Sequence, residues 1–135
     1  MDGKKRWVVS TDGTYVLDKE TGLVWEQSPD TTLRTWFNAS FDAYNKAVSG
    51  RRGWRLPTVE ELKSLVDPTQ TNLALPKGHP FKNVQPGLYW TATTNSSLTS
   101  SAWFVLFSSG DAGYGSKTNG YYVWCVRGGQ GYDGQ

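Results

Sequence analysis

The chain of 135 residues has little of what catalytic and metal sites are usually built from. It holds one cysteine, Cys125, and one histidine, His79. A single cysteine excludes a disulfide within the chain and a metal site made of several cysteines. A single histidine excludes a metal site built on a histidine pair, and a Ser–His–acid triad would have to use His79, which we expect in a surface loop. No glycine-rich loop lies between a strand and a helix, so phosphate binding of that kind is not expected.

Long apolar runs are also missing. No segment approaches the roughly 18 apolar residues of a membrane span, and the first residues include no apolar signal region. The net charge of +2 is too small to indicate nucleic acid as a partner. The length predicts one domain over residues 1–135, with a mobile glycine-rich end at residues 128–135.

Charge is scarce in the last third of the chain. Of the 26 Lys, Arg, Asp and Glu residues, only Asp111, Lys117, Arg127 and Asp133 follow Lys82. In residues 91–121, 18 of the 31 positions are Ser, Thr, Asn or Gly, with Trp, Phe and Tyr between them. This combination resembles the composition of antibody binding loops. It favours a recognition surface over a catalytic site.

Local patterns predict short strands and two helices. Thr35 and Thr58 are expected to cap helices, and Thr58 with Glu61 forms a capping-box pattern. The first helix carries Trp36, Ala39 and Ala43 on one side and is expected to reach Gly50. Strands are expected at residues 6–10, 14–17, 23–26, 102–107 and 121–127, with loops at 69–85 and 110–120.

The strand at residues 102–107 alternates apolar side chains on both faces. We expect Trp103, Val105 and Phe107 to face the core, and Phe104 and Leu106 to face solvent. Trp25, Trp54, Trp90 and Trp103 are then the expected aromatic core. Cys125 lies in a hydrophobic last strand and is expected to be a small buried residue.

Several segments together resemble one known family. They are Thr21–Trp25, Gly53–Thr58 followed by Glu60–Leu62, Tyr89–Thr91, Ala102–Phe107 and Cys125–Arg127. In this order they resemble the bacterial Lcl C-terminal-like domain family, which has a C-type-lectin-like fold. The resemblance implies an α+β domain with two helices packed on a twisted antiparallel sheet. In many members a cysteine near the end of the first helix pairs with that of the last strand; here Asn45 stands at that place, which leaves Cys125 free.

The last third is similar to the variable proteins of diversity-generating retroelements, which display a hypervariable patch on a lectin-like scaffold. Trp124 stands where such proteins usually have Arg before the Cys, so the resemblance implies an exposed aromatic in the patch. The calcium-site triplets Glu-Pro-Asn and Trp-Asn-Asp do not occur. No cofactor is expected.

These observations predict a non-enzymatic ligand-binding display domain at a cell surface or outside the cell, with a protein or glycan as its ligand. The predicted ligand-binding residues are Thr93, Asn95, Ser97, Phe104, Leu106, Ser108, Ser109, Asp111, Tyr114, Tyr121 and Trp124. Phe104, Leu106, Tyr114 and Trp124 are expected to form one exposed patch. One alternative is a fixed adhesin that binds glycans or sulfated polysaccharides through Arg51, Arg52 and Lys117. A second alternative is an enzyme of the formylglycine-generating type, in which only Cys125 could act.

Overall fold

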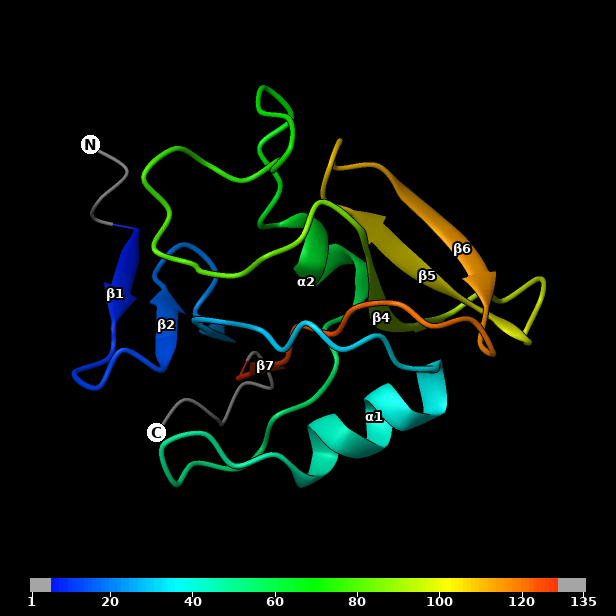
Figure 1. Cartoon of the computed structure of the whole chain (residues 1–135), viewed down its shortest axis with the longest axis horizontal. Coiled ribbons are helices and arrows are strands. Elements are labelled where there is room, and N and C mark those ends of the chain that lie inside the picture. Colours follow the sequence, from blue (N-terminus) through cyan, green and yellow to red (C-terminus); the bar gives the residue numbers. More distant parts are fainter. Residues whose placement is uncertain (1–5, 129–135) are drawn as a thin grey trace.

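The computed structural model describes residues 6–128, which form two antiparallel sheets and two helices (Figure 1). The first sheet has the strand order β1-β2-β3-β7, and the second has the order β4-β5-β6. The elements are β1 Trp7–Val9, β2 Tyr15–Asp18, β3 Val24–Glu26, α1 Trp36–Asn45, α2 Val59–Lys63, β4 Leu88–Thr94, β5 Ser101–Leu106, β6 Ala112–Ser116 and β7 Val126–Arg127.

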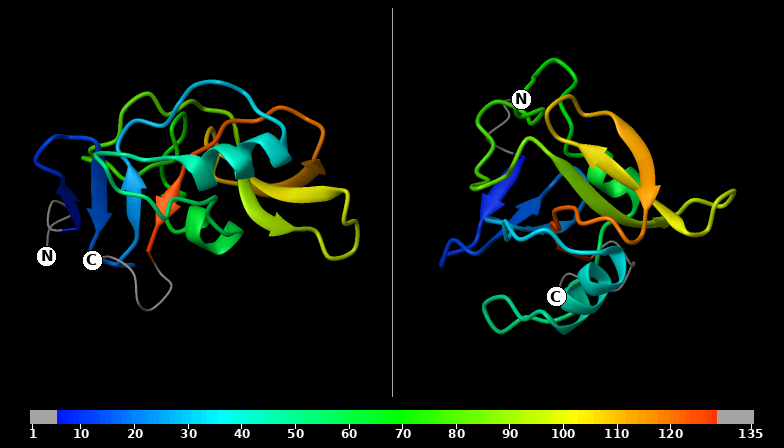
Figure 2. Two further views of the ribbon diagram at one scale, coloured as in Figure 1. Left: turned by 90° about the horizontal axis from the view of Figure 1, so that it is seen from below. Right: turned by 45° about the vertical axis from the view of Figure 1, so that its right-hand side comes forward.

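The expected mixture of two helices with antiparallel strands is confirmed, but the single expected sheet is replaced by two. The sheets lie side by side, with α2 between them and α1 along one flank (Figures 1 and 2). Of the expected mobile end, only Gly128 is described, and it is buried. The rest of that prediction lies outside the described residues.

Both helices begin where the sequence predicts. The Thr35 side chain accepts a hydrogen bond from the Asn38 amide, and the capping box of Thr58 and Glu61 is complete. Each cap satisfies amides that the first turn of a helix leaves without partners. α1 ends at Asn45, before the predicted Gly50, because Lys46 already has extended backbone angles.

Arg55 fixes α2 against the rest of the chain. Its guanidinium makes two hydrogen bonds to the Glu61 carboxylate, at 2.8 and 2.9 Å, and a third to the Gly128 carbonyl at 2.7 Å. Burial acts to raise the pKa of Glu61, but the hydrogen bonds from Arg55 and Thr58 outweigh it and hold this pKa below its ordinary value. The start of α2 is therefore anchored by a charged pair as well as by its cap.

The core consists of two hydrophobic clusters separated by the segment at residues 123–126. Trp124 and Val126 belong to the first cluster, with Trp25, Leu62 and Phe107 among its other members. Val123 and Cys125 belong to the second cluster, with Trp54 and Trp90. The expected burial of Trp25, Trp54, Trp90 and Cys125 is confirmed.

Trp124 lies at the centre of the first cluster. Its ring contacts Trp25 from the first sheet, Phe107, which directly follows β5, and Phe81 and Tyr89, with centroids 4.9–6.0 Å apart. Its Nε1 donates to the Glu26 carbonyl at 2.9 Å. The expected exposure of Trp124 is wrong, because both faces of the 123–126 segment are covered by packed side chains.

Trp103, by contrast, is more exposed than the sequence predicts. Val105 and Phe107 are fully buried, but Trp103, on the same face of β5, is only half-buried. α2 has only five residues and leaves this end of the face partly uncovered. Trp103 instead packs edge-on against Tyr114, with ring centroids 5.5 Å apart.

The segment at residues 110–120, expected to be a connection only, contains the strand β6. Gly113 and Gly115 interrupt the alternation of side chains by which a strand is recognised in a sequence. The structure nevertheless requires glycine at both positions. A Cβ on Gly113 would lie 2.8 Å from the ring of Phe104, and one on Gly115 would meet the Tyr121 hydroxyl. The predicted last strand is also shorter, since only Val126–Arg127 pairs as β7. Tyr121 and Tyr122 make single bridges as the chain crosses between the sheets.

Replacing Trp124 with Ala should destabilise the domain far more than replacing Trp103 with Ala. We expect the Trp124 variant to lose about 3–5 kcal/mol of unfolding free energy, as for a core aromatic, and the Trp103 variant less than half of that. Urea denaturation of the two variants measures the difference. Equal losses would show that Trp103, near the start of β5, belongs to the core after all.

Candidate functional site

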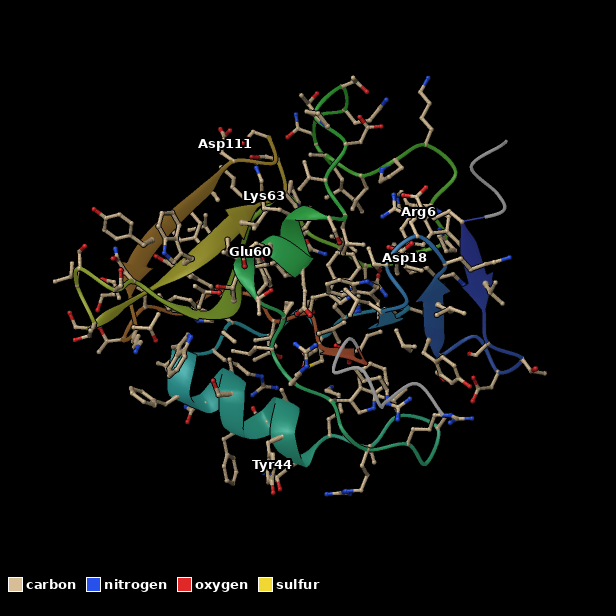
Figure 3. All side chains as sticks on the ribbon, turned by 180° about the vertical axis from the view of Figure 1, so that it is seen from behind. Arg6, Asp18, Tyr44, Glu60, Lys63 and Asp111 are labelled. Carbon is tan, nitrogen blue, oxygen red and sulfur yellow. The ribbon has the colours of Figure 1, made fainter. Side chains whose placement is uncertain are left out.

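An open groove lies between α2 and the outer part of the second sheet. Val59, Glu60 and Lys63 of α2, with Ser64 directly after the helix, form one wall. Thr93, Trp103 and Ala112 supply one residue from each strand of the second sheet. Figure 3 shows Glu60 and Lys63 on α2, beside the sheet. The groove has a volume of about 680 Å³. This lies within the range of small-molecule and side-chain binding sites.

The floor of the groove follows from the strand register. Trp103 pairs directly with Tyr114, and Val105 pairs with Ala112. Because paired residues in an antiparallel sheet point to the same face, Trp103, Ala112 and Tyr114 share one surface with α2. Tyr114 is 53% exposed. Two large rings therefore lie at one end of the groove, with Tyr114 in contact with solvent.

Hydrogen bonds hold the walls of the groove in place. The Val59 amide, at the first turn of α2, donates to the Thr93 hydroxyl at 2.9 Å. Lys63 Nζ donates to the Gly110 carbonyl at 3.0 Å, which ties the other end of α2 to the β5–β6 turn. Among residues 6–128, the Glu60 carboxylate has no hydrogen-bond partner, and its side chain is exposed. The groove thus offers a fixed apolar floor with one carboxylate available at its rim.

The structure brings some of the predicted ligand-binding residues to this groove. Thr93 lines it and Tyr114 lies beside it. Ser108, Ser109 and Asp111 lie at the β5–β6 turn, to which Lys63 is bonded, and the Ser109 hydroxyl donates to the Asp111 carboxylate. Figure 3 shows Asp111 at that turn, on the same side of the molecule as Lys63.

The other predicted residues lie elsewhere. Ser97 is exposed in the β4–β5 loop, but Asn95 is buried there, and its Oδ1 accepts a hydrogen bond from the Ser97 amide. Tyr121 is half-buried, with its ring centroid 4.3 Å from that of Trp90. Asn95 and Tyr121 therefore contribute to packing and loop structure.

The single patch predicted around Phe104, Leu106, Tyr114 and Trp124 is wrong. Phe104 and Leu106 are on the face of β5 opposite to Trp103, whereas Tyr114 shares the face of Trp103. Phe104 and Leu106 are half-buried, and Phe104 packs edge-on against Tyr121. Trp124 is fully buried.

Sequence reasoning missed the α2 side of the groove. Val59, Glu60, Lys63 and Ala112 were not predicted as binding residues, and Trp103 was assigned to the core. The capping box located the start of α2, but nothing in the local pattern shows which strand the helix packs against. Had β6 been recognised as a strand, pairing it with β5 would have indicated that Trp103 and Tyr114 lie on the same face of the sheet.

The basic residues of the adhesin alternative do not form one patch. Lys117 Nζ lies 4.2 Å from the ring centroid of Trp36, the first residue of α1. Arg51 bridges to Val48, beyond the last residue of α1, and Arg52 follows it. A helix of ten residues is about 15 Å long, so these cations lie at opposite ends of it.

A second, smaller cavity of about 120 Å³ lies beside α1 and is lined by charged side chains. Its charges are paired within the chain: Arg34 contacts Asp30 and Asp42 at 2.9 and 2.8 Å, and Lys46 contacts Glu26 at 2.9 Å. Within residues 6–128, no group of three or more His, Cys, Asp or Glu residues could hold a metal ion. We assign this cavity a structural role.

Cys125 lines the same small cavity but is almost fully buried. Burial raises the pKa of its thiol well above the ordinary value, and the nearby Glu26 carboxylate raises it further. Because the thiolate is the nucleophile, this environment is poorly suited to covalent catalysis.

Cys125 should therefore react slowly with a thiol reagent in the native protein. We expect modification by a small disulfide reagent at pH 8 to be slow in native protein and complete within minutes in denaturant, followed by absorbance. Equal rates in the two states would contradict the burial and would favour the enzyme alternative. Cys125→Ala provides the blank for non-specific reaction.

Comparison with known proteins gives one family. The model of the family described as the Lcl C-terminal domain matches residues 14–127, which is most of the chain. No curated protein matches the sequence. In the part of the chain that the structure describes, no helix has the length and apolar character needed to cross a membrane.

Proposed function

Because the chain belongs to the Lcl C-terminal domain family, which points to ligand binding or display, we propose that it is a non-enzymatic ligand-binding domain that holds its ligand in the groove between α2 and the second sheet. The observation that carries this proposal is the half-buried Trp103 on the groove floor beside the exposed Tyr114. Trp and Tyr are enriched among the residues that contribute most to binding energy at protein interfaces.

The chemistry of the groove favours a protein ligand that inserts an apolar side chain. Val59, Trp103 and Ala112 provide an apolar surface, and Thr93 and Ser64 provide the hydroxyl groups. Charge is confined to Glu60 and Lys63 on the α2 wall, and the Lys63 ammonium is already bonded to Gly110. A glycan would need more polar groups directed into the groove than these residues offer. A glycan ligand is therefore the second outcome of the binding test.

The fold fits the same proposal. Two helices on antiparallel sheets, with a last segment that crosses between the sheets, support the C-type-lectin-like fold that the family resemblance implies. Such a scaffold holds Trp103 on a central strand and thus keeps it fixed before the ligand arrives. Rigid aromatic side chains bind at low entropic cost. We place the domain at a cell surface or outside the cell, where a display function operates.

Trp103→Ser and Tyr114→Ser should each weaken ligand binding by about 2 kcal/mol, roughly thirtyfold, because each removes an aromatic contact surface. Ligands are first selected with the wild-type domain from a phage-displayed peptide library and, in parallel, from a glycan array. Each selected ligand is then titrated against both variants by calorimetry.

Tyr44→Ser is the matched control for this test. Tyr44 is 78% exposed on α1 and points away from the rest of the molecule (Figure 3). We expect it to leave binding unchanged, with similar thermal midpoints for the Tyr44 and Tyr114 variants. Selected ligands that bind both groove variants as tightly as the wild type would refute the proposed site.

We further propose that the display is diversified by a retroelement, on the strength of the Ser-, Asn- and aromatic-rich last third. Variation should then fall on Thr93 and Trp103, which line the groove, and on Tyr114 beside it, and spare the buried Trp124 and Val105. Sequencing the gene with its neighbourhood tests this. We expect a reverse transcriptase and a near-copy of the coding region that differs at adenines. Substitutions concentrated at buried positions would contradict the proposal.

A further inference from the structure

β6 is the outer strand of its sheet and offers an open edge. The order β4-β5-β6 leaves one side of β6 without a neighbouring strand within residues 6–128. Figure 2 shows the strand at the periphery of the molecule. An open edge presents unpaired amide and carbonyl groups, which is a ready template for pairing with another chain.

The hydrogen-bond register shows which groups point outward. The Leu106 amide donates to the Asp111 carbonyl at 2.8 Å, and the Lys117 amide donates to the Ser100 carbonyl at 2.9 Å. Hydrogen-bonded pairs recur every second residue in an antiparallel ladder, so Gly113 and Gly115 also bond to β5. The backbone groups of Ala112, Tyr114 and Ser116 therefore point away from the sheet.

These outward groups lack partners in the described part of the chain. The Ala112 carbonyl, both backbone groups of Tyr114 and the Ser116 amide make no hydrogen bond there. The Ser116 carbonyl is used by the turn that follows, where it accepts from the Asn119 amide at 2.9 Å. Four groups on the edge are thus available for a neighbouring strand.

We propose that β6 pairs antiparallel with β6 of a second copy of this chain, centred on Tyr114. In that register Tyr114 faces Tyr114, and Ala112 faces Ser116. The two Tyr114 residues exchange two hydrogen bonds, and each Ser116 amide donates to the Ala112 carbonyl opposite. Every bond uses a group that is unpartnered in the single chain, and the Ser116 carbonyl is not needed.

Charge favours a second copy over an unrelated strand. Asp111 and Lys117 are the only charged residues between Lys82 and Arg127, and each lies three positions from Tyr114. In the proposed register Asp111 of each copy therefore faces Lys117 of the other, and facing opposite charges stabilise a sheet. The Lys117 ammonium is already held in place by the Trp36 ring at 4.2 Å. The strand is complementary to itself.

The pairing would join the two second sheets into one of six strands with both grooves on the same face. Facing residues share a face, so the two Tyr114 rings lie side by side, each with its own Trp103 behind it. A surface that carries several copies of a ligand would then be bound by two grooves at once, which raises the overall affinity. The pairing itself does not depend on what the groove binds.

Cysteine cross-linking tests the register. Facing residues of a hydrogen-bonded pair have Cα atoms about 5.5 Å apart, within the range for a disulfide. The Ala112 residues of the two copies would be about 14 Å apart, because they are offset by four positions. Tyr114→Cys should give a disulfide-linked dimer under mild oxidation, and Ala112→Cys should not. The double variant Ala112→Cys with Ser116→Cys should cross-link again.

Tyr44→Cys, on exposed α1, is the matched control for random collision. Cross-linking of Tyr114→Cys no faster than that of Tyr44→Cys would overturn the proposal. The wild type, with Cys125 buried, provides the background.

A charge exchange provides a second, independent measurement. Asp111→Lys should weaken dimerisation by roughly tenfold in sedimentation velocity, because like charges then face each other at two places. Adding Lys117→Asp to it should restore the association, and circular dichroism confirms that both variants are folded. A wild type that stays monomeric up to millimolar concentration, or a dimer indifferent to the exchange, would refute the pairing.

Discussion

The packing around Trp124 is the constraint on which the rest of the structure depends. Its ring is the point where side chains from both sheets meet, and its Nε1 is bonded to the Glu26 carbonyl. The neighbouring Cys125 amide donates to the Glu26 carboxylate at 2.8 Å, and that carboxylate pairs with Lys46 after α1. The segment at residues 123–126 therefore fixes how the two sheets and α1 sit relative to one another. This packing holds in place the second sheet, which forms the floor of the groove.

The groove exists because one face of the second sheet is only partly covered. α2 is long enough to cover Val105 and Phe107 but too short to cover Trp103. On the opposite face, Phe104 and Tyr121 fill the space that the glycines of β6 leave open. The face of β5 that carries Trp103 thus has a covered part around Val105 and Phe107, which belongs to the core, and an open part at Trp103, which lines the groove. The proposed pairing uses the backbone groups along the edge of β6, and the proposed ligand site uses side chains on one face of the sheet, so the two adjoin at Tyr114.

The candidate site could be predicted only in part, for reasons that particular residues show. Composition drew attention to residues 91–121, which contain Thr93, Trp103, Ala112 and Tyr114 of the groove region. Alternation along β5 placed Val105 and Phe107 in the core but could not show that the cover ends before Trp103. The groove brings Glu60 and Lys63 together with Ala112, residues about 50 positions apart, and no local pattern relates them.

The sequence by itself determined the caps of both helices, the alternation of β5 and the burial of Trp25, Trp54 and Trp90, because these depend on neighbouring residues and on hydrophobicity. Only the tertiary structure decided how far Trp103 and Trp124 are buried. Two similar side chains in similar strand-like segments end up in different environments, since burial depends on what other parts of the chain cover them. The 123–126 segment is enclosed on both faces, whereas the part of β5 around Trp103 extends beyond the cover of α2.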